Sequence, residues 1–98
     1  MRQTKIDAYV MDTLMPDLVL HDRQPSAFLT YLHLWHRAGG RPAPVTASHR
    51  DIADATGLSK SAVQNAIRTL IRRRLVRGTR AAPTAVPQYA VLCPWRRQ

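Results

Sequence analysis

Apolar residues recur with helical spacing over residues 25–38, which begin with Pro25 and end before two glycines. Proline is favoured at the first position of a helix and glycine just past its end, so this pattern predicts a helix. Its apolar side chains occupy much of the helix circumference: Phe28, Leu29, Tyr31, Leu32, Leu34 and Trp35. Such a helix should have neighbours on two sides, which either the N-terminal segment or a second subunit would supply.

Residues 1–24 have a mixed pattern that fits both a helix and a strand. In the helical interpretation, Asp12 caps a short helix over residues 13–20. In the other interpretation, residues 8–11 form a short strand. The sequence leaves these alternatives open.

Residues 48–73 have the pattern of two short helices joined by a tight turn. Ser48, with Asp51 three residues later, has the pattern of a capping box at the start of the first helix. Gly57 suits the left-handed backbone that ends a helix, and Ser59 is placed to cap the second helix. A small residue in the first helix and apolar residues at the junction permit close approach: Ala53, Ile52, Leu58 and Val63. This is the pattern of a helix-turn-helix, with one departure at Thr56, where a larger aliphatic residue would be usual.

The second helix of this pair has an apolar side and a polar side. At about 100° per residue, the apolar side holds Val63, Ala66, Ile67 and Leu70. The capping residue and the polar side of the helix are expected to contact DNA. These residues are Ser59, Lys60, Ser61, Gln64, Asn65, Arg68 and Arg72. Arg can bond two acceptors of guanine, and Asn or Gln can pair with adenine, so Gln64, Asn65 and Arg68 are predicted to contact bases. At the start of the first helix, His49 is predicted to lie near a phosphate, and Ser48 is predicted to contact DNA.

After these helices the pattern changes to that of strands. Residues 75–94 predict a β-hairpin, with strands over residues 75–80 and 88–93 and an uncharged loop rich in Pro and Ala. Val45 predicts a further brief strand. Residues 95–98 are expected to form a basic tail, with the tryptophan at its start folding back onto the body of the protein.

The chain has 98 residues and a net charge of +9, from 15 Lys and Arg against six Asp. Residues 1–54 hold six basic residues and all six acidic ones, whereas residues 55–98 hold nine basic residues and no acid. A surface that neutralises phosphates gains affinity by releasing condensed counterions. The predicted partner is double-stranded DNA.

Other classes of protein lack their signatures in this sequence. An apolar content of 45% with six aromatic residues favours one folded domain over residues 1–98. No run approaches the roughly 20 apolar residues that cross a membrane, and the polar start does not resemble a secretory signal, so we expect a cytoplasmic protein. The single Cys93 is expected to be a buried structural residue. His33 and His36 lack further ligands for a metal, and no catalytic constellation is present, so we expect no enzyme activity, cofactor or small-molecule ligand.

Three segments carry a resemblance to a known family: residues 48–57, "SHRDIADATG"; residues 58–68, "LSKSAVQNAIR"; and residues 70–76, "LIRRRLV". They resemble the winged helix-turn-helix family of bacterial and phage DNA-binding proteins. Together with the predicted helix before them and the hairpin after them, the resemblance covers residues 25–94. It implies an α+β fold that is mainly α with a small β-hairpin.

The resemblance also implies roles for particular parts of the chain. The helix capped by Ser59 would be the recognition helix, and the hairpin of residues 75–94 would be the wing. Arg77 and Arg80 would then contact the DNA backbone or the minor groove. Arg74 also departs from the family, because such domains usually place glycine at this position. Either Arg74 takes a left-handed backbone or the helix ends differently.

The functional prediction is sequence-specific binding of double-stranded DNA by a small transcriptional regulator, a repressor, acting as a homodimer on a two-fold operator. One alternative is a plasmid or phage replication or partition protein that binds DNA. Another is an interaction module that uses a winged helix to bind protein or RNA. The positive charge would suit any polyanion, but the side-chain amides on the polar face can pair with base edges and therefore favour DNA.

Overall fold

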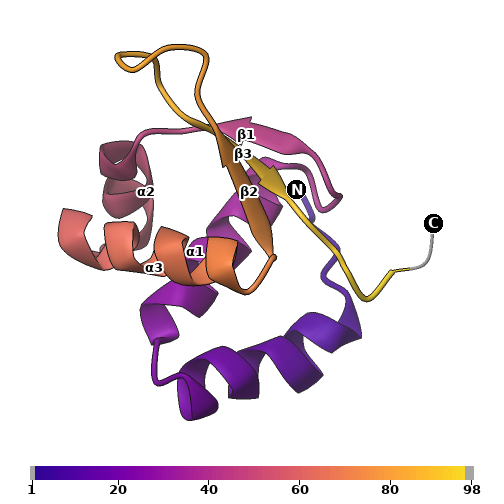
Figure 1. The fold of residues 1–98 in the computed structure, drawn as a ribbon. Helices are drawn as coiled ribbons and strands as arrows, with labels where there is room; N and C mark the ends of the chain where they lie inside the picture. The colour runs from indigo at the N-terminus through magenta and orange to yellow at the C-terminus, as the bar shows by residue number, and fades with distance from the viewer. Residues whose placement is uncertain (1, 97–98) are drawn as a thin grey trace.

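The computed structural model describes residues 2–96 and consists of helices packed beneath a small antiparallel sheet (Figure 1). The predicted class, mainly α with a small β component, is confirmed. The elements are, in chain order, η1 (Val10–Leu14), η2 (Pro16–His21), α1 (Pro25–Arg37), β1 (Pro44–Thr46), α2 (His49–Thr56), α3 (Lys60–Arg72), β2 (Val76–Thr79) and β3 (Gln88–Val91).

The sheet has three strands in the order β1-β3-β2, all antiparallel. The predicted hairpin forms β2 and β3, in which Val76 lies opposite Val91. The predicted strand at Val45 pairs with the outer side of β3, where Val45 lies opposite Tyr89. Both predicted strands of the hairpin are shorter than expected, so the loop at the tip runs over residues 80–87.

Helix α1 lies at the centre of the core, between the N-terminal segment and α3. Its side chains Tyr31, Leu34 and Trp35 are at most 1% exposed. The N-terminal segment, through η2, is therefore one of the neighbours expected for α1. Leu29, expected to widen the buried face, is instead 45% exposed because the segment leading into α1 does not cover that side.

The N-terminal segment is helical, and its turns begin earlier than the sequence suggested. The amide of Val10 donates to the carbonyl of Asp7, 3.0 Å away, so Asp12 lies inside the helical segment and does not cap it. The turns are of the wide π type, in which each amide bonds five residues back. Val10, Leu14 and Leu18 are buried at intervals of four residues, and burying Val10 requires the helical turns to begin before it.

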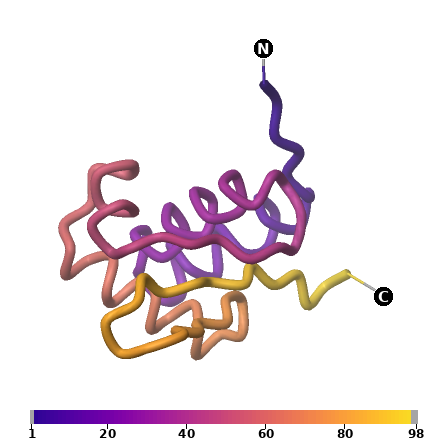
Figure 2. The backbone as a smooth tube through the Cα atoms, turned by 90° about the horizontal axis from the view of Figure 1, so that it is seen from above, coloured from indigo at the N-terminus to yellow at the C-terminus, as the bar shows by residue number. Residues whose placement is uncertain are grey.

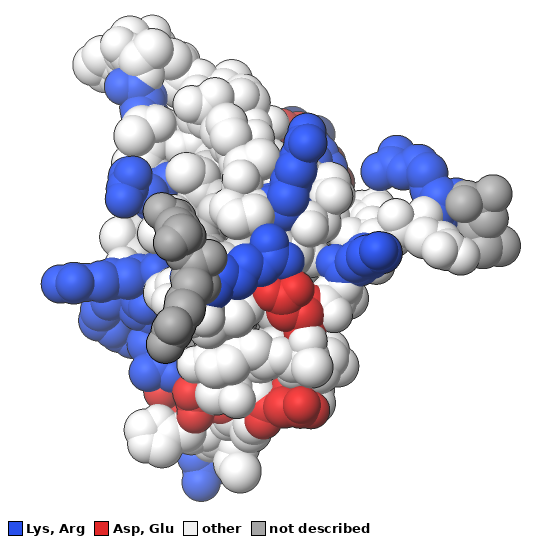
Figure 3. All heavy atoms as spheres, turned by 90° about the vertical axis from the view of Figure 1, so that its right-hand side faces the viewer, with Lys and Arg blue, Asp and Glu red and all other residues white. Residues whose placement is uncertain are grey.

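Seen from above, α3 and the hairpin loop lie on the same side of the molecule, with α1 behind them (Figure 2). The charges are also separated. Residues 6–22 hold four Asp and no Lys or Arg. In the view of Figure 3, several acidic side chains gather in the lower part of the molecule, whereas most basic side chains lie above them and along the left edge.

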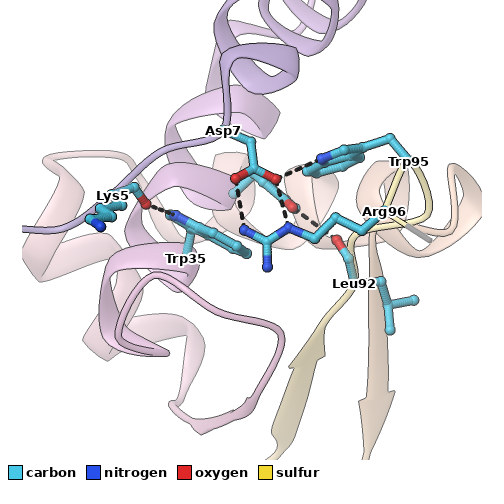
Figure 4. Close-up of polar contacts among 7 residues, drawn as sticks. Lys5, Asp7, Trp35, Leu92, Trp95 and Arg96 are labelled. Carbon is cyan, nitrogen blue, oxygen red and sulfur yellow. Dashed lines mark hydrogen bonds and ion pairs between the residues drawn. The ribbon is translucent and has the colours of Figure 1, made fainter. Parts of the chain in front are cut away.

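A cluster of polar contacts joins the two ends of the described chain (Figure 4). The carboxylate of Asp7 accepts two hydrogen bonds from the Arg96 guanidinium, both 2.7 Å, and one from Trp95 Nε1 at 2.8 Å. The ring of Trp95 stacks on Tyr9, with centroids 4.7 Å apart. Arg96 also lies over the ring of Trp35, 5.2 Å from its centroid. We call these residues the terminal clasp.

The terminal clasp corrects one prediction and confirms another. Residues 95–98 were expected to form a basic tail. Arg96 is instead paired with the carboxylate of Asp7, because the N-terminal segment brings Asp7 beside it. Trp95 does fold back onto the body, as expected. Residues 97–98 lie outside the described part of the chain.

Asp7→Asn should make unfolding less sensitive to acid. The Arg96 guanidinium and then the Trp95 N–H lower the pKa of Asp7 from 3.8 to about 2. A lowered folded-state pKa contributes stability that is present above pH 4 and is lost as pH falls toward 2. We therefore expect the variant to lose about 1 kcal/mol at pH 7, and the difference to shrink below pH 4, in denaturant unfolding across this range. Asp12→Asn, at an exposed position of the same segment, is the control and should match the unaltered protein; equal acid sensitivity of all three proteins would contradict the prediction.

The backbone at the end of α3 follows the first of the two alternatives given for Arg74. This residue takes the left-handed backbone, with φ of 58°, and the amide of Leu75 then closes the helix by donating to the carbonyl of Leu70 at 2.9 Å. Arg73 beside it points to the acidic segment, 3.3 Å from Asp22 and 3.6 Å from Asp17.

Within residues 2–96, no helix has the length and apolar content to cross a bilayer.

Candidate nucleic-acid interface

Both helices of the predicted helix-turn-helix begin at a serine cap, and the cap of α2 is reciprocal. Ser48 Oγ accepts from the amide of Asp51, and the Asp51 carboxylate accepts from the amide of Ser48, both at 3.0 Å. These bonds lower the pKa of Asp51. Gly57 ends α2 with φ of 78°, and Ser59 Oγ accepts from the amide of Ala62 at 3.1 Å. The capping box, the left-handed turn and the second cap are all present as predicted.

Helix α3 has the orientation that its pattern predicts. Its apolar side packs on α1 and α2. Four predicted core residues on this side are at most 5% exposed: Val63, Ala66, Ile67 and Leu70. The polar side faces outward, and its predicted contact residues are all exposed: Ser59, Lys60, Ser61, Gln64, Asn65, Arg68 and Arg72.

One hollow brings together residues that the sequence placed in three separate segments. It has a volume of about 210 Å³. Its lining comes from the start of α2, the start of α3 and the loop after β2: Ser48, His49, Arg50, Lys60, Arg80 and Pro87. We call it the cap hollow. Four of its six residues were predicted as DNA contacts, and the fold gives them one shared opening.

The cap hollow is electrically positive. Burial, and then the charges of Arg80 and Lys60, lower the pKa of His49 below its ordinary value of 6.5. The imidazole is therefore neutral near pH 7 beside two fixed cations. Arg80 is positioned by a hydrogen bond of 3.1 Å from Nη1 to the carbonyl of Pro83. Such a group of donors and positive charges suits an anion, which would also favour protonation of His49.

The residues predicted to contact bases lie together on the outer side of α3. Arg68 Nη1 donates to Asn65 Oδ1 at 3.3 Å, so these two side chains hold one another. Gln64 lies one residue before Asn65 and is exposed. A planar guanidinium held beside one amide, with a second amide on the same exposed side, is the kind of surface that matches hydrogen-bonding edges of bases.

Two residues differ from expectation. Arg77, predicted as a contact of the hairpin, does not join the cap hollow; with Arg74 and Arg96 it lines a different groove beside β2. Cys93 borders that groove and is only partly buried, although burial still raises the pKa of its thiol. Among residues 2–96, no three His, Cys, Asp or Glu side chains gather as a metal site would require.

The sequence reasoning missed two basic residues near this interface. Arg50 lines the cap hollow, and its place beside His49 was a usable signal. Arg23 lies across a groove from Asn65 and Arg68 on α3. No local pattern marks Arg23, because its position depends on how α1 packs against α3.

Comparison with known proteins agrees with this geometry. A model of the family described as "Helix-turn-helix domain" matches residues 24–76, more than half of the chain. The chain belongs to this family. Among solved structures, it is similar to the crystal structure of the AntR antimony-specific transcriptional repressor, with a TM-score of 0.53 and 23% identity over 96% of this chain and 75% of that chain. At this identity the likeness concerns the fold, and the winged helix-turn-helix fold is thereby confirmed. No curated protein matches the chain.

Proposed function

We propose that this helix-turn-helix protein binds double-stranded DNA sequence-specifically, with α3 in the major groove and the loop after β2 as the wing. The observation that supports this most is the position of the cap hollow beside the exposed polar side of α3. Phosphate would bind at the hollow through His49, Lys60 and Arg80. Base edges would bind at Gln64, Asn65 and Arg68. The remaining predicted contacts are Ser48, Ser59, Ser61, Arg72 and Arg77.

The regulatory role belongs to the same proposal. A protein whose described fold is largely the DNA-reading unit can repress transcription by occupying a promoter and excluding polymerase. A two-fold operator would require a homodimer. Because α1 is covered by the protein's own N-terminal segment, the more suitable surface is the exposed side of that segment, which presents Met11, Met15 and Leu20. Sedimentation of the protein with and without operator DNA measures the assembly.

The test is selection of bound fragments from the source genome, followed by competition. A selected duplex should outcompete random duplex, whereas RNA and heparin should compete only at low salt, where unspecific charge dominates. Equal binding of every polyanion would favour an interaction module, and no binding of any duplex at low salt would refute the proposal. Selected fragments at promoters would support a repressor. Fragments at repeated sequences of a replication origin would favour a replication or partition protein.

Protonation of His49 should link DNA binding to pH. In the free protein its pKa is below 6.5, and a bound phosphate would raise it, so binding takes up a proton over the interval between the two values. Operator affinity should therefore increase as pH falls from 7.5 to 5.5, by at most about tenfold per pH unit, the limit for one proton. Measuring the dissociation constant at constant ionic strength across this range tests the linkage.

His49→Gln should bind with little dependence on pH in this interval. His36→Gln is the matched control, because His36 lies at the far end of α1 and bonds Thr4 in the N-terminal segment. It should keep the dependence of the unaltered protein. If His49→Gln keeps the full dependence, the proton is taken up elsewhere and His49 does not lie beside phosphate.

A further inference from the structure

A second groove runs along the other edge of the exposed side of α3. Its volume is about 550 Å³. One wall is the segment that enters α1, with Arg23 and Gln24, and the other wall is α3, with Arg68 and Arg72. We call it the entry groove. It shares Asn65 and Arg68 with the proposed base-contacting surface, so the two surfaces are continuous.

The shape of the entry groove is held by bonds that leave its charges available. Thr69 Oγ1 donates to Gln24 Oε1 at 2.7 Å, which fastens the entering segment to α3. The acid next in sequence, Asp22, is occupied by Arg73 at 3.3 Å and by His21 at 3.1 Å. Within residues 2–96, Arg23 and Arg72 have no hydrogen bond or ion pair of their side chains.

The backbone at Arg23 is also unusual. Its φ is 54°, the left-handed region that residues other than glycine, asparagine and aspartate rarely adopt. The sharp turn follows from the amide of Gln24, which donates to the carbonyl of Leu18 at 2.7 Å and ends η2. This turn places the Arg23 side chain at the wall of the groove instead of in the acidic segment that precedes it.

The length of α3 indicates which part of a bound duplex would lie at the entry groove. Thirteen residues make a helix about 20 Å long, whereas the major groove is about 12 Å wide. Arg72 lies two turns beyond Gln64, so it would emerge from the groove when the first half of α3 contacts bases. A cation that emerges there meets the sugar-phosphate backbone, and Arg23 stands opposite it.

Resting on the proposed function, we propose that Arg23 and Arg72 together hold one backbone phosphate of the bound duplex in the entry groove. This phosphate flanks the bases contacted by α3 and lies on the opposite side of that helix from the cap hollow. The two sites would fix α3 between two points of the backbone. Arg23 is thereby a DNA contact that its sequence position does not reveal.

The experiment combines protein variants with neutralised phosphates. A set of selected duplexes carries one uncharged methylphosphonate each, stepped through the site, and the dissociation constant is measured for each duplex. Arg23→Asn is used because asparagine tolerates the left-handed backbone. Arg23→Asn, Arg72→Gln and the double variant are compared with Arg41→Gln, at an exposed arginine beyond the opposite end of α1. Thermal melting establishes that each variant is folded.

We expect the unaltered protein and Arg41→Gln to lose affinity at a flanking methylphosphonate that the double variant does not detect. The double variant should also reduce the slope of log affinity against log salt by about one unit, the release expected for one phosphate. An identical methylphosphonate profile in the double variant would overturn the inference while the unaltered protein still selects its operator. Failure of the unaltered protein to bind any duplex would overturn the proposed function as well.

Discussion

Val63→Asp should unfold the protein or abolish the packing of α3. Val63 is fully buried on the apolar side of that helix. The substitution removes a buried aliphatic side chain, worth about 2 kcal/mol, and leaves a carboxylate without a partner, which costs several kcal/mol more. A domain of this size is stable by about 5–15 kcal/mol, so most of the free energy of unfolding is lost. Thermal melting followed by circular dichroism measures the change.

Gln64→Asp is the matched control, because it places the same carboxylate one residue later on the exposed side of the helix. A surface substitution of this kind changes stability by about 0.5 kcal/mol or less. The control should keep its melting temperature but lose DNA affinity through repulsion of phosphate. If both variants melt alike, the orientation of α3 described above is wrong.

The pattern of residues was sufficient to predict the helix-turn-helix because its demands are local. A capping box, a left-handed glycine and apolar residues spaced three or four apart each act within one or two helical turns. Ser48, Gly57 and Val63 therefore have the positions that the sequence predicted. The sheet was predicted in part, since the strand at Val45 was recognised but its partner in β3 lies more than forty residues away.

Thr56 shows how a residue that departs from a pattern can still satisfy it. A larger aliphatic residue is usual at this point of the motif. In the structure Thr56 Oγ1 donates to the carbonyl of Ile52 at 2.7 Å and accepts from the amide of Leu58 at 3.3 Å. The hydroxyl thus joins the end of α2 to the turn by hydrogen bonds. The sequence shows that a hydroxyl is present at this position, but it does not show which backbone groups the hydroxyl bonds.

The remaining differences come from contacts between distant segments. Arg73 and Arg96 belong to the basic half of the sequence, yet both are paired with Asp residues of the N-terminal segment. Net charge therefore overstates the charge available to a polyanion, because part of it is neutralised within the fold. Arg23 is the reverse case, a basic residue of the neutral half that the packing of α1 brings beside α3. Composition alone cannot separate these outcomes.

Arg68→Ala should weaken operator binding by about 1 to 3 kcal/mol and relax the preference at one base pair. Arg68 lies on the exposed side of α3, and its guanidinium is held beside Asn65. A guanidinium that bonds two acceptors of one guanine supplies both affinity and discrimination, so both should be lost together. Binding to the operator and to each single-base variant of it measures the two effects separately.

Arg68→Lys distinguishes contact with a base from contact with phosphate. Lysine keeps the charge but loses the planar pair of donors, so a base contact predicts retained binding to random duplex and lost discrimination at that base pair. A phosphate contact instead predicts that Arg68→Lys behaves as the unaltered protein while Arg68→Ala weakens all duplexes equally. Arg41→Ala, at an exposed arginine in the connector after α1, should leave both quantities unchanged. Unaltered discrimination in Arg68→Ala would remove Arg68 from the base-contacting surface and leave Gln64 and Asn65 to determine sequence preference.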